Sequence, residues 1–243
     1  MRREARFNEV RFNADGAGGV VVGADDAGRR PVVLLTTAIS GVNDYVLRQA
    51  DRLAEAGYAC AVLDYYARDG GRAPDLSTPE KIMAAVGALS DETVLGDMAA
   101  AVAWLKEQPG IDRIGTLGFC IGGTYALLAA SRIPDLRCAV TFYGMLRYAK
   151  LSDTKPLSPL DAAEKVGCPF LGHFGEADHL VPVADARELA DRLRGKPAEI
   201  YTYPGAGHAF HEDFRPDVYR PVAATTAWTR TQEYLAYYLR EGT

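Results

Sequence analysis

The chain has 243 residues, of which 48% are hydrophobic and 24% charged, a composition typical of globular proteins. Its 27 basic residues are outnumbered by 32 acidic ones, for a formal net charge of −5, and no basic block of the kind that binds a phosphate backbone occurs. No apolar stretch approaches the roughly 18 residues that span a bilayer, and residues 1–10 lack the apolar core of a signal peptide. We therefore expect a single cytoplasmic domain over residues 1–243 that binds neither nucleic acid nor membrane.

The first predicted element is a hairpin. Residues 3–22 alternate between apolar or β-branched and polar side chains on both sides of Asn13-Ala14-Asp15-Gly16, a sequence that favours a turn. This pattern predicts one or two antiparallel strands at the start of the chain.

Six short apolar runs then alternate with segments whose apolar residues recur about every 3.6 positions. The runs predict buried strands at residues 31–35, 58–63, 113–117, 137–142, 168–174 and 198–203. Helical spacing is found in residues 46–53, 98–105, 124–130, 186–193 and 222–239, with a further helix start at Ser77-Thr78-Pro79-Glu80 and a helix end at Gly57. Residues 68–76 predict an exposed loop. The alternation predicts an α/β fold: a mostly parallel central sheet with helices on both faces.

The four cysteines are scattered singly along the chain. No paired spacing suggests a disulfide framework or a zinc site. Cys60, Cys138 and Cys168 lie inside apolar strand patterns, so we expect them to be buried and unreactive. Cys120 has a different setting.

Cys120 is the central residue of Gly118-Phe119-Cys120-Ile121-Gly122-Gly123, which follows a predicted strand and precedes a predicted helix, the context of a nucleophile elbow. An elbow strains its central residue and requires small flanking residues, which Gly118 and Gly122 supply. At the positive end of the helix dipole a thiolate is favoured, and the Ile121 N–H is free to bind the oxyanion of a tetrahedral intermediate. The alternative is an ordinary glycine-rich turn containing a small core cysteine.

Two further strands are followed by residues that complete a catalytic triad. Asp178 comes just after the strand at 168–174, and His208 lies on the glycine-rich loop after the strand at 198–203. Because parallel strands end at the same edge of a sheet, Cys120, Asp178 and His208 can converge there. We expect His208 to accept the thiol proton and Asp178 to fix the His208 tautomer.

These residues make the sequence resemble the dienelactone hydrolase family of the α/β-hydrolase superfamily over nearly the whole chain. The cysteine elbow, the G-x-x-D-x-x-V-P segment from Gly175 and the G-x-x-H-x-F segment from Gly205 match motifs of that family. The resemblance implies an α/β-hydrolase fold and a carboxylic ester hydrolase of the carboxymethylenebutenolidase type, with no cofactor and no metal. It also implies that the backbone N–H of Ile39 is the second oxyanion donor.

One departure from the family's pattern concerns activation of the cysteine. Family members typically carry a glutamate just before the residue matching Ile39, and that glutamate holds the resting cysteine. This chain has Ala38 there. We therefore expect Cys120 to pair directly with His208.

A second departure concerns the substrate. Members that hydrolyse dienelactone bind its carboxylate with arginines, whereas the position four residues after His208 is Glu212 here. A buried carboxylate needs a cationic partner, and a nearby glutamate acts in the opposite sense. We expect a substrate other than dienelactone itself, unless Arg68, Lys81 or Arg215 supplies the cation by another route.

The expected partner is a small-molecule ester or lactone, and the chain is expected to be a monomer or a dimer. Candidate substrate-binding residues near the predicted strand ends are Tyr45, Tyr66, Arg68, Tyr143, Phe210 and His211. Two alternatives stay open. One is a thioesterase or acyltransferase on the same scaffold, and the other is a non-catalytic redox-sensing or binding protein with a reactive cysteine.

Overall fold

The computed structural model describes residues 7–23 and 30–241, and its centre is an eight-stranded sheet in the order β1-β2-β4-β3-β5-β6-β7-β8. Strands β3 to β8 are parallel to one another, and β1 and β2 form an antiparallel addition that pairs with β4. The strands are β1 (Glu9–Ala14), β2 (Ala17–Val22), β3 (Arg30–Thr36), β4 (Ala59–Asp64), β5 (Ile111–Phe119), β6 (Leu136–Phe142), β7 (Phe170–Gly175) and β8 (Ala198–Tyr203).

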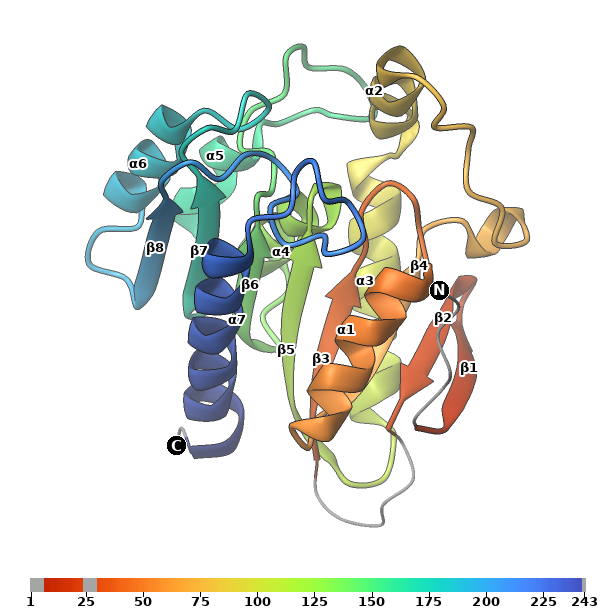
Figure 1. Ribbon diagram of the computed structural model, residues 1–243. Helices are drawn as coiled ribbons and strands as arrows, with labels where there is room; N and C mark the ends of the chain where they lie inside the picture. The colour runs from red at the N-terminus through yellow and green to blue at the C-terminus, as the bar shows by residue number, and fades with distance from the viewer. Residues whose placement is uncertain (1–6, 24–29, 242–243) are drawn as a thin grey trace.

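Helices cover both faces of the sheet (Figure 1). The apolar sides of α1 and α7 pack on one face, while those of α3, α4 and α6 pack on the other. The helices are α1 (Asp44–Glu55), α2 (Pro79–Ala88), α3 (Asp91–Lys106), α4 (Ile121–Arg132), α5 (Pro159–Ala162), α6 (Val183–Arg192) and α7 (Pro221–Ala236), which continues as a π-helical turn over Tyr237–Glu241. The predicted mostly parallel sheet with helices on both faces is confirmed.

Local signals placed several elements correctly. The Asn13 side chain accepts a hydrogen bond from Gly16 N (3.0 Å), and this turn joins β1 to β2 as an antiparallel hairpin. Residues 3–6 of the predicted hairpin lie outside the described residues. At α2, Thr78 accepts from Lys81 N (3.3 Å) with Pro79 in the first turn, as the helix-start signal predicts.

Several boundaries differ from the sequence-based prediction by a few residues, and three differences stand out. The strand predicted from Cys168 begins at Phe170, because Pro169 has no N–H to donate to a neighbouring strand. The predicted loop at 68–76 starts within a short 3₁₀ turn, Ala67–Asp69, and α5 has no counterpart in the prediction. A four-residue helix is too short to show a periodic apolar pattern.

None of the helices in residues 7–23 and 30–241 has both the length and the apolar character needed to cross a bilayer.

Candidate active site

The turn between β5 and α4 has the geometry of a nucleophile elbow. Cys120 adopts φ 55° and ψ −123°, a conformation that is strained for a residue with a side chain. The elbow also brings backbones very close together. A Cβ on Gly118 would lie 2.1 Å from the Gly122 carbonyl oxygen, and one on Gly122 would lie 2.3 Å from the Thr36 carbonyl oxygen. Glycine is therefore required at both positions, as the sequence pattern indicated.

The structure brings Cys120, Asp178 and His208 together at the carboxyl edge of the sheet. The Nε2 atom of His208 lies 3.2 Å from Cys120 Sγ, and its Nδ1 lies 2.9 Å from Asp178 Oδ2. The other carboxylate oxygen of Asp178 accepts hydrogen bonds from Leu180 N (2.8 Å) and Val181 N (3.0 Å). The Asp178 side chain is fully buried and both of its oxygens are bonded, so it holds the imidazole in one orientation.

The environment of His208 favours its charged form. Burial by itself lowers the pKa of His208, but the charges of Cys120 and Asp178 and the hydrogen bonds with them more than offset burial and raise this pKa from 6.5 to about 10. An imidazolium in this position can neutralise negative charge on the Cys120 sulfur. The arrangement suits a proton that moves along the Cys120–His208 hydrogen bond during a reaction.

Two backbone N–H groups, those of Ile121 and Ile39, are the predicted oxyanion donors. Ile121 is the first residue of α4, so its N–H has no acceptor within the helix. Ile39 lies in the loop between β3 and α1, where the Ala38 carbonyl accepts from Gly41 N (3.0 Å). The roles of both amides stay predictions at this point.

Five of the six predicted substrate-binding residues are buried, and one of them contacts His208. The Tyr143 ring lies edge-on to His208 with the ring centroids 5.2 Å apart, and the Phe210 ring packs against Tyr143. The Tyr45 hydroxyl lies 2.6 Å from Nδ1 of His211. Burial lowers the pKa of His211 to about 3, so this ring is neutral at physiological pH.

Two of the predicted substrate-binding residues already have partners inside the protein. Tyr66 donates from its hydroxyl to the Ile39 carbonyl (2.7 Å). Arg68 forms an ion pair with the buried Asp97 (2.5 Å) and also donates to the Asp15 carbonyl in the β1–β2 turn. These contacts account for the hydroxyl of Tyr66 and the guanidinium of Arg68 without a ligand.

The other two candidate cations also form ion pairs. Lys81 pairs with Asp75 (2.6 Å) on the exposed segment before α2. Arg215 pairs with Glu212 (3.1 Å), whose side chain is nearly buried. Burial raises the pKa of Glu212, while Arg215 and His208 lower it in part, which places Glu212 within electrostatic reach of the triad.

Sequence reasoning overlooked the contact that Tyr65 makes. The hydroxyl of Tyr65 donates to the Thr37 carbonyl (2.9 Å) in the same loop that carries Ile39. Its pKa is raised by burial and also by the charge of Cys120. Tyr65 directly follows β4 and Thr37 directly follows β3, and the parallel pairing of these two strands was the signal that could have suggested this contact.

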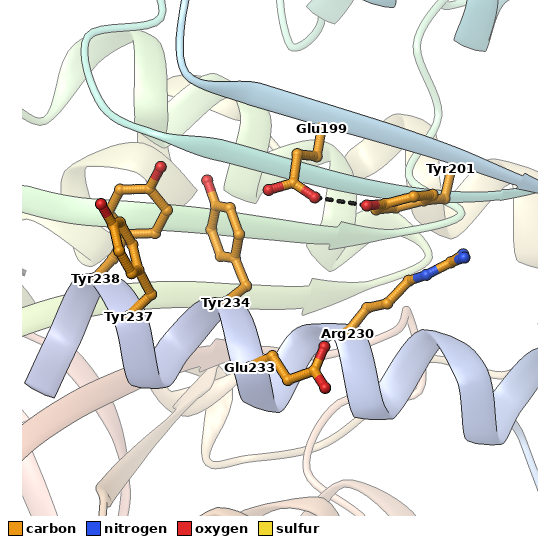
Figure 2. Close-up of a pocket in the computed structure, with 7 residues that line it drawn as sticks. All are labelled: Glu199, Tyr201, Arg230, Glu233, Tyr234, Tyr237 and Tyr238. Carbon is orange, nitrogen blue, oxygen red and sulfur yellow. Dashed lines mark hydrogen bonds between the residues drawn. The ribbon is translucent and has the colours of Figure 1, made fainter. Parts of the chain in front are cut away.

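The structure also has a cavity of about 400 Å³ at the outer edge of the sheet, on β8 and α7 (Figure 2). None of the triad residues lines it. The Tyr234 hydroxyl in its wall is buried without a hydrogen-bond partner. The lining residues are Glu199, Tyr201, Arg230, Glu233, Tyr234, Tyr237 and Tyr238. Within the described part of the chain, no group of three or more His, Cys, Asp or Glu side chains is arranged to hold a metal ion.

Known proteins share this sequence and fold. The model of the dienelactone hydrolase family matches residues 17–239. A Bradyrhizobium sp protein named as a 2-oxo-3-(5-oxofuran-2-ylidene)propanoate lactonase is 45% identical over 216 residues, 87% of this chain and 86% of that protein. A Methylorubrum extorquens protein named as a carboxymethylenebutenolidase is 35% identical over 88% of this chain and 74% of its own length.

A solved structure from Klebsiella pneumoniae, described as a dienelactone hydrolase, has a TM-score of 0.83 at 28% identity and covers 96% of this chain and 98% of its own. The sheet and helices described above are those of the α/β-hydrolase fold. The chain belongs to the dienelactone hydrolase family and is a hydrolase of ester or lactone bonds.

Proposed function

We propose that this protein hydrolyses a lactone or ester through a covalent intermediate on Cys120. The observation that supports this most directly is the continuous chain of hydrogen bonds from Asp178 through His208 to Cys120, at 2.9 and 3.2 Å, with the cysteine on a strained elbow. The same order of nucleophile, acid and base occurs in α/β-hydrolases generally.

Acylation follows from this geometry. His208 holds the proton of Cys120 while the sulfur attacks the carbonyl carbon, and the carbonyl oxygen becomes an oxyanion bound by the N–H groups of Ile39 and Ile121. The intermediate collapses when the C–O bond breaks and His208 gives its proton to the departing oxygen. In a lactone this oxygen stays within the acyl group, because the ring has opened.

Deacylation uses the same residues in the reverse order. His208 takes a proton from a water molecule, and the resulting hydroxide attacks the thioester carbonyl. The second tetrahedral intermediate collapses with release of the Cys120 thiolate and the carboxylic acid. Asp178 keeps the imidazole in the tautomer that both half-reactions need.

For the substrate, we propose a lactone other than dienelactone. Ala38 and Glu212 occupy positions where dienelactone-hydrolysing relatives are expected to have glutamate and arginine. The relative with 45% identity is named for a 5-oxofuran-2-ylidene lactone carrying a 2-oxopropanoate group. This lactone is therefore the first candidate substrate, and Arg215, held by Glu212 at 3.1 Å, is the candidate partner of its carboxylate.

The test is pre-steady-state hydrolysis of 4-nitrophenyl acetate, with intact-mass detection of an acetyl adduct, for the wild type, Cys120→Ala and the control Cys168→Ala. We expect a burst and an adduct in the wild type and the control, and neither in Cys120→Ala. Persistence of the burst in Cys120→Ala would contradict the nucleophile assignment.

A lactone panel then tests the substrate. Turnover of the 2-oxopropanoate lactone with a higher kcat/KM than dienelactone is the expected result, and a preference for dienelactone would contradict the proposal. Alkylation of Cys120 without turnover of any ester would favour a redox sensor. Faster release of the acyl group from Cys120 when alcohol or amine acceptors are added would favour an acyltransferase.

A further inference from the structure

The loop that carries Ile39 is held by hydrogen bonds at three consecutive carbonyl groups. The Thr37 carbonyl accepts from the Tyr65 hydroxyl (2.9 Å), the Ala38 carbonyl from Gly41 N (3.0 Å), and the Ile39 carbonyl from the Tyr66 hydroxyl (2.7 Å). Two of these three donors are side chains of the tyrosines Tyr65 and Tyr66. They follow β4, which is the parallel neighbour of β3, with Leu63 opposite Thr36.

These bonds determine where the Ile39 N–H points. A peptide unit is planar, so the direction of the Ile39 N–H is set by the same plane as the Ala38 carbonyl. The two peptide units on either side are the ones that Tyr65 and Tyr66 hold. If the peptide unit between Ala38 and Ile39 rotates, the peptide units on either side must also turn. The hydrogen bonds of those two units to the tyrosine hydroxyls resist this rotation.

The two tyrosines are themselves well fixed. Tyr65 is buried with its ring edge-on to Tyr125, at a centroid distance of 5.7 Å, and the Tyr125 hydroxyl is bonded to the buried Lys155 (2.8 Å). The backbone N–H of Tyr66 donates to Asp64 Oδ1 (2.9 Å). Gly41 has φ 71°, and a Cβ there would lie 3.1 Å from the Tyr66 ring, so the glycine makes room for that ring.

We propose that Tyr65 and Tyr66 are positioning residues of the oxyanion hole, which hold the Ile39 N–H aimed at the oxyanion that forms next to Cys120. This inference rests on the proposed function. Preorganised donors lower the barrier because they need not reorient when the charge develops. Burial raises the pKa of Tyr66 to about 12 and that of Tyr65 further, so both hydroxyls remain donors at neutral pH.

The experiment separates oxyanion stabilisation from thiol reactivity. Tyr65→Phe, Tyr66→Phe and the double variant are compared with Tyr234→Phe, a matched control that removes a tyrosine hydroxyl without a partner. Two rates are measured: acylation by 4-nitrophenyl acetate, which forms an oxyanion, and alkylation of Cys120 by iodoacetamide, which forms none. The other cysteines are buried, so alkylation reports on Cys120.

We expect acylation to fall about tenfold in each single variant and about a hundredfold in the double variant, which is the lower end of the cost of losing one oxyanion donor. The KM for the ester and the alkylation rate should stay within about twofold of the control. Unchanged acylation would overturn the proposal. A parallel fall in alkylation would also overturn it, because it would show general disruption of the site. The proposed function has its own test: it is contradicted if the Cys120→Ala variant still shows a burst.

Discussion

Two histidines in this protein have both ring nitrogens bonded to side chains, but their pKa values move in opposite directions. His208 bonds to Cys120 and Asp178, which can both be negative, and its pKa is raised to about 10. His173 bonds to the neutral hydroxyls of Tyr203 (2.8 Å) and Thr231 (3.0 Å), and burial and the charge of Arg230 lower its pKa well below the usual value.

The comparison shows that the chemical type of the partner decides what a bonded histidine can do. Arg230 donates to the Tyr203 hydroxyl (3.2 Å). That hydroxyl donates to Nδ1 of His173, because the proton of the neutral ring lies on Nε2. The Thr231 hydroxyl donates to the Ala227 carbonyl (2.9 Å) and accepts from Nε2 of His173. His173 is therefore held neutral as a structural group, whereas His208 can hold a proton beside a nucleophile.

The largest expected effect distinguishes the two histidines by activity. His208→Ala should lower kcat for any accepted ester by about 10⁴-fold or more, because the thiol loses its base. His173→Ala should instead lower the free energy of unfolding by about 3 kcal/mol, since it leaves a buried cavity and removes one of the two partners of the Tyr203 hydroxyl. Ester hydrolysis per folded molecule and urea unfolding check the two outcomes, and retained turnover in His208→Ala would contradict the triad.

A smaller loss of activity is expected when only the orienting group is changed. Asp178→Asn presents an amide N–H to Nδ1 of His208, so the neutral imidazole carries its proton on Nε2 and cannot accept the Cys120 proton. We expect kcat to fall by about 10²- to 10⁴-fold. Thr231→Val, which removes a hydrogen-bond partner of His173, serves as the control and should keep kcat. Equal kcat in the two variants would contradict the orienting role of Asp178.

The pH dependence of stability should reveal the two histidines with opposite signs. The folded pKa of His208 lies above 6.5, so its contribution is complete below about pH 6.5 and is lost as the pH rises to about 10. The folded pKa of His173 lies below 6.5, so its contribution is present above that pH and is lost as the pH falls.

Urea unfolding across this pH range checks the signs. Compared with the wild type, His208→Gln should lose less stability on the alkaline side, and His173→Ala less on the acid side. If His208→Gln loses as much stability at alkaline pH as the wild type does, groups other than His208 cause that loss.

The smallest expected effect concerns the hydroxyls of Tyr203 and Tyr234. The Tyr203 hydroxyl bonds to both His173 and Arg230, while the Tyr234 hydroxyl is buried without a partner. Tyr203→Phe should cost about 1–2 kcal/mol, and Tyr234→Phe should change stability by less than about 0.5 kcal/mol or increase it. Thermal and urea unfolding measure both, and a larger loss for Tyr234→Phe would indicate a partner for its hydroxyl in solution.

The sequence by itself determined the elements whose causes are local. Gly118 and Gly122 reveal the elbow because backbone crowding excludes every other residue at these positions. The hairpin at Asn13 and the start of α2 at Thr78 follow from side chains that bond to neighbouring backbone groups. The positions of Asp178 and His208 after parallel strands were also readable, because the ends of parallel strands share one edge of the sheet.

The tertiary structure alone decided which side chains meet across that edge. Arg68, predicted near the substrate, is paired with Asp97, and Tyr66 bonds to the Ile39 carbonyl. His211, which follows His208 by three residues, is buried against Tyr45, 166 positions away in the chain. Such contacts depend on strand register and side-chain direction, and these are set by the packing of distant segments, about which local spacing carries no information.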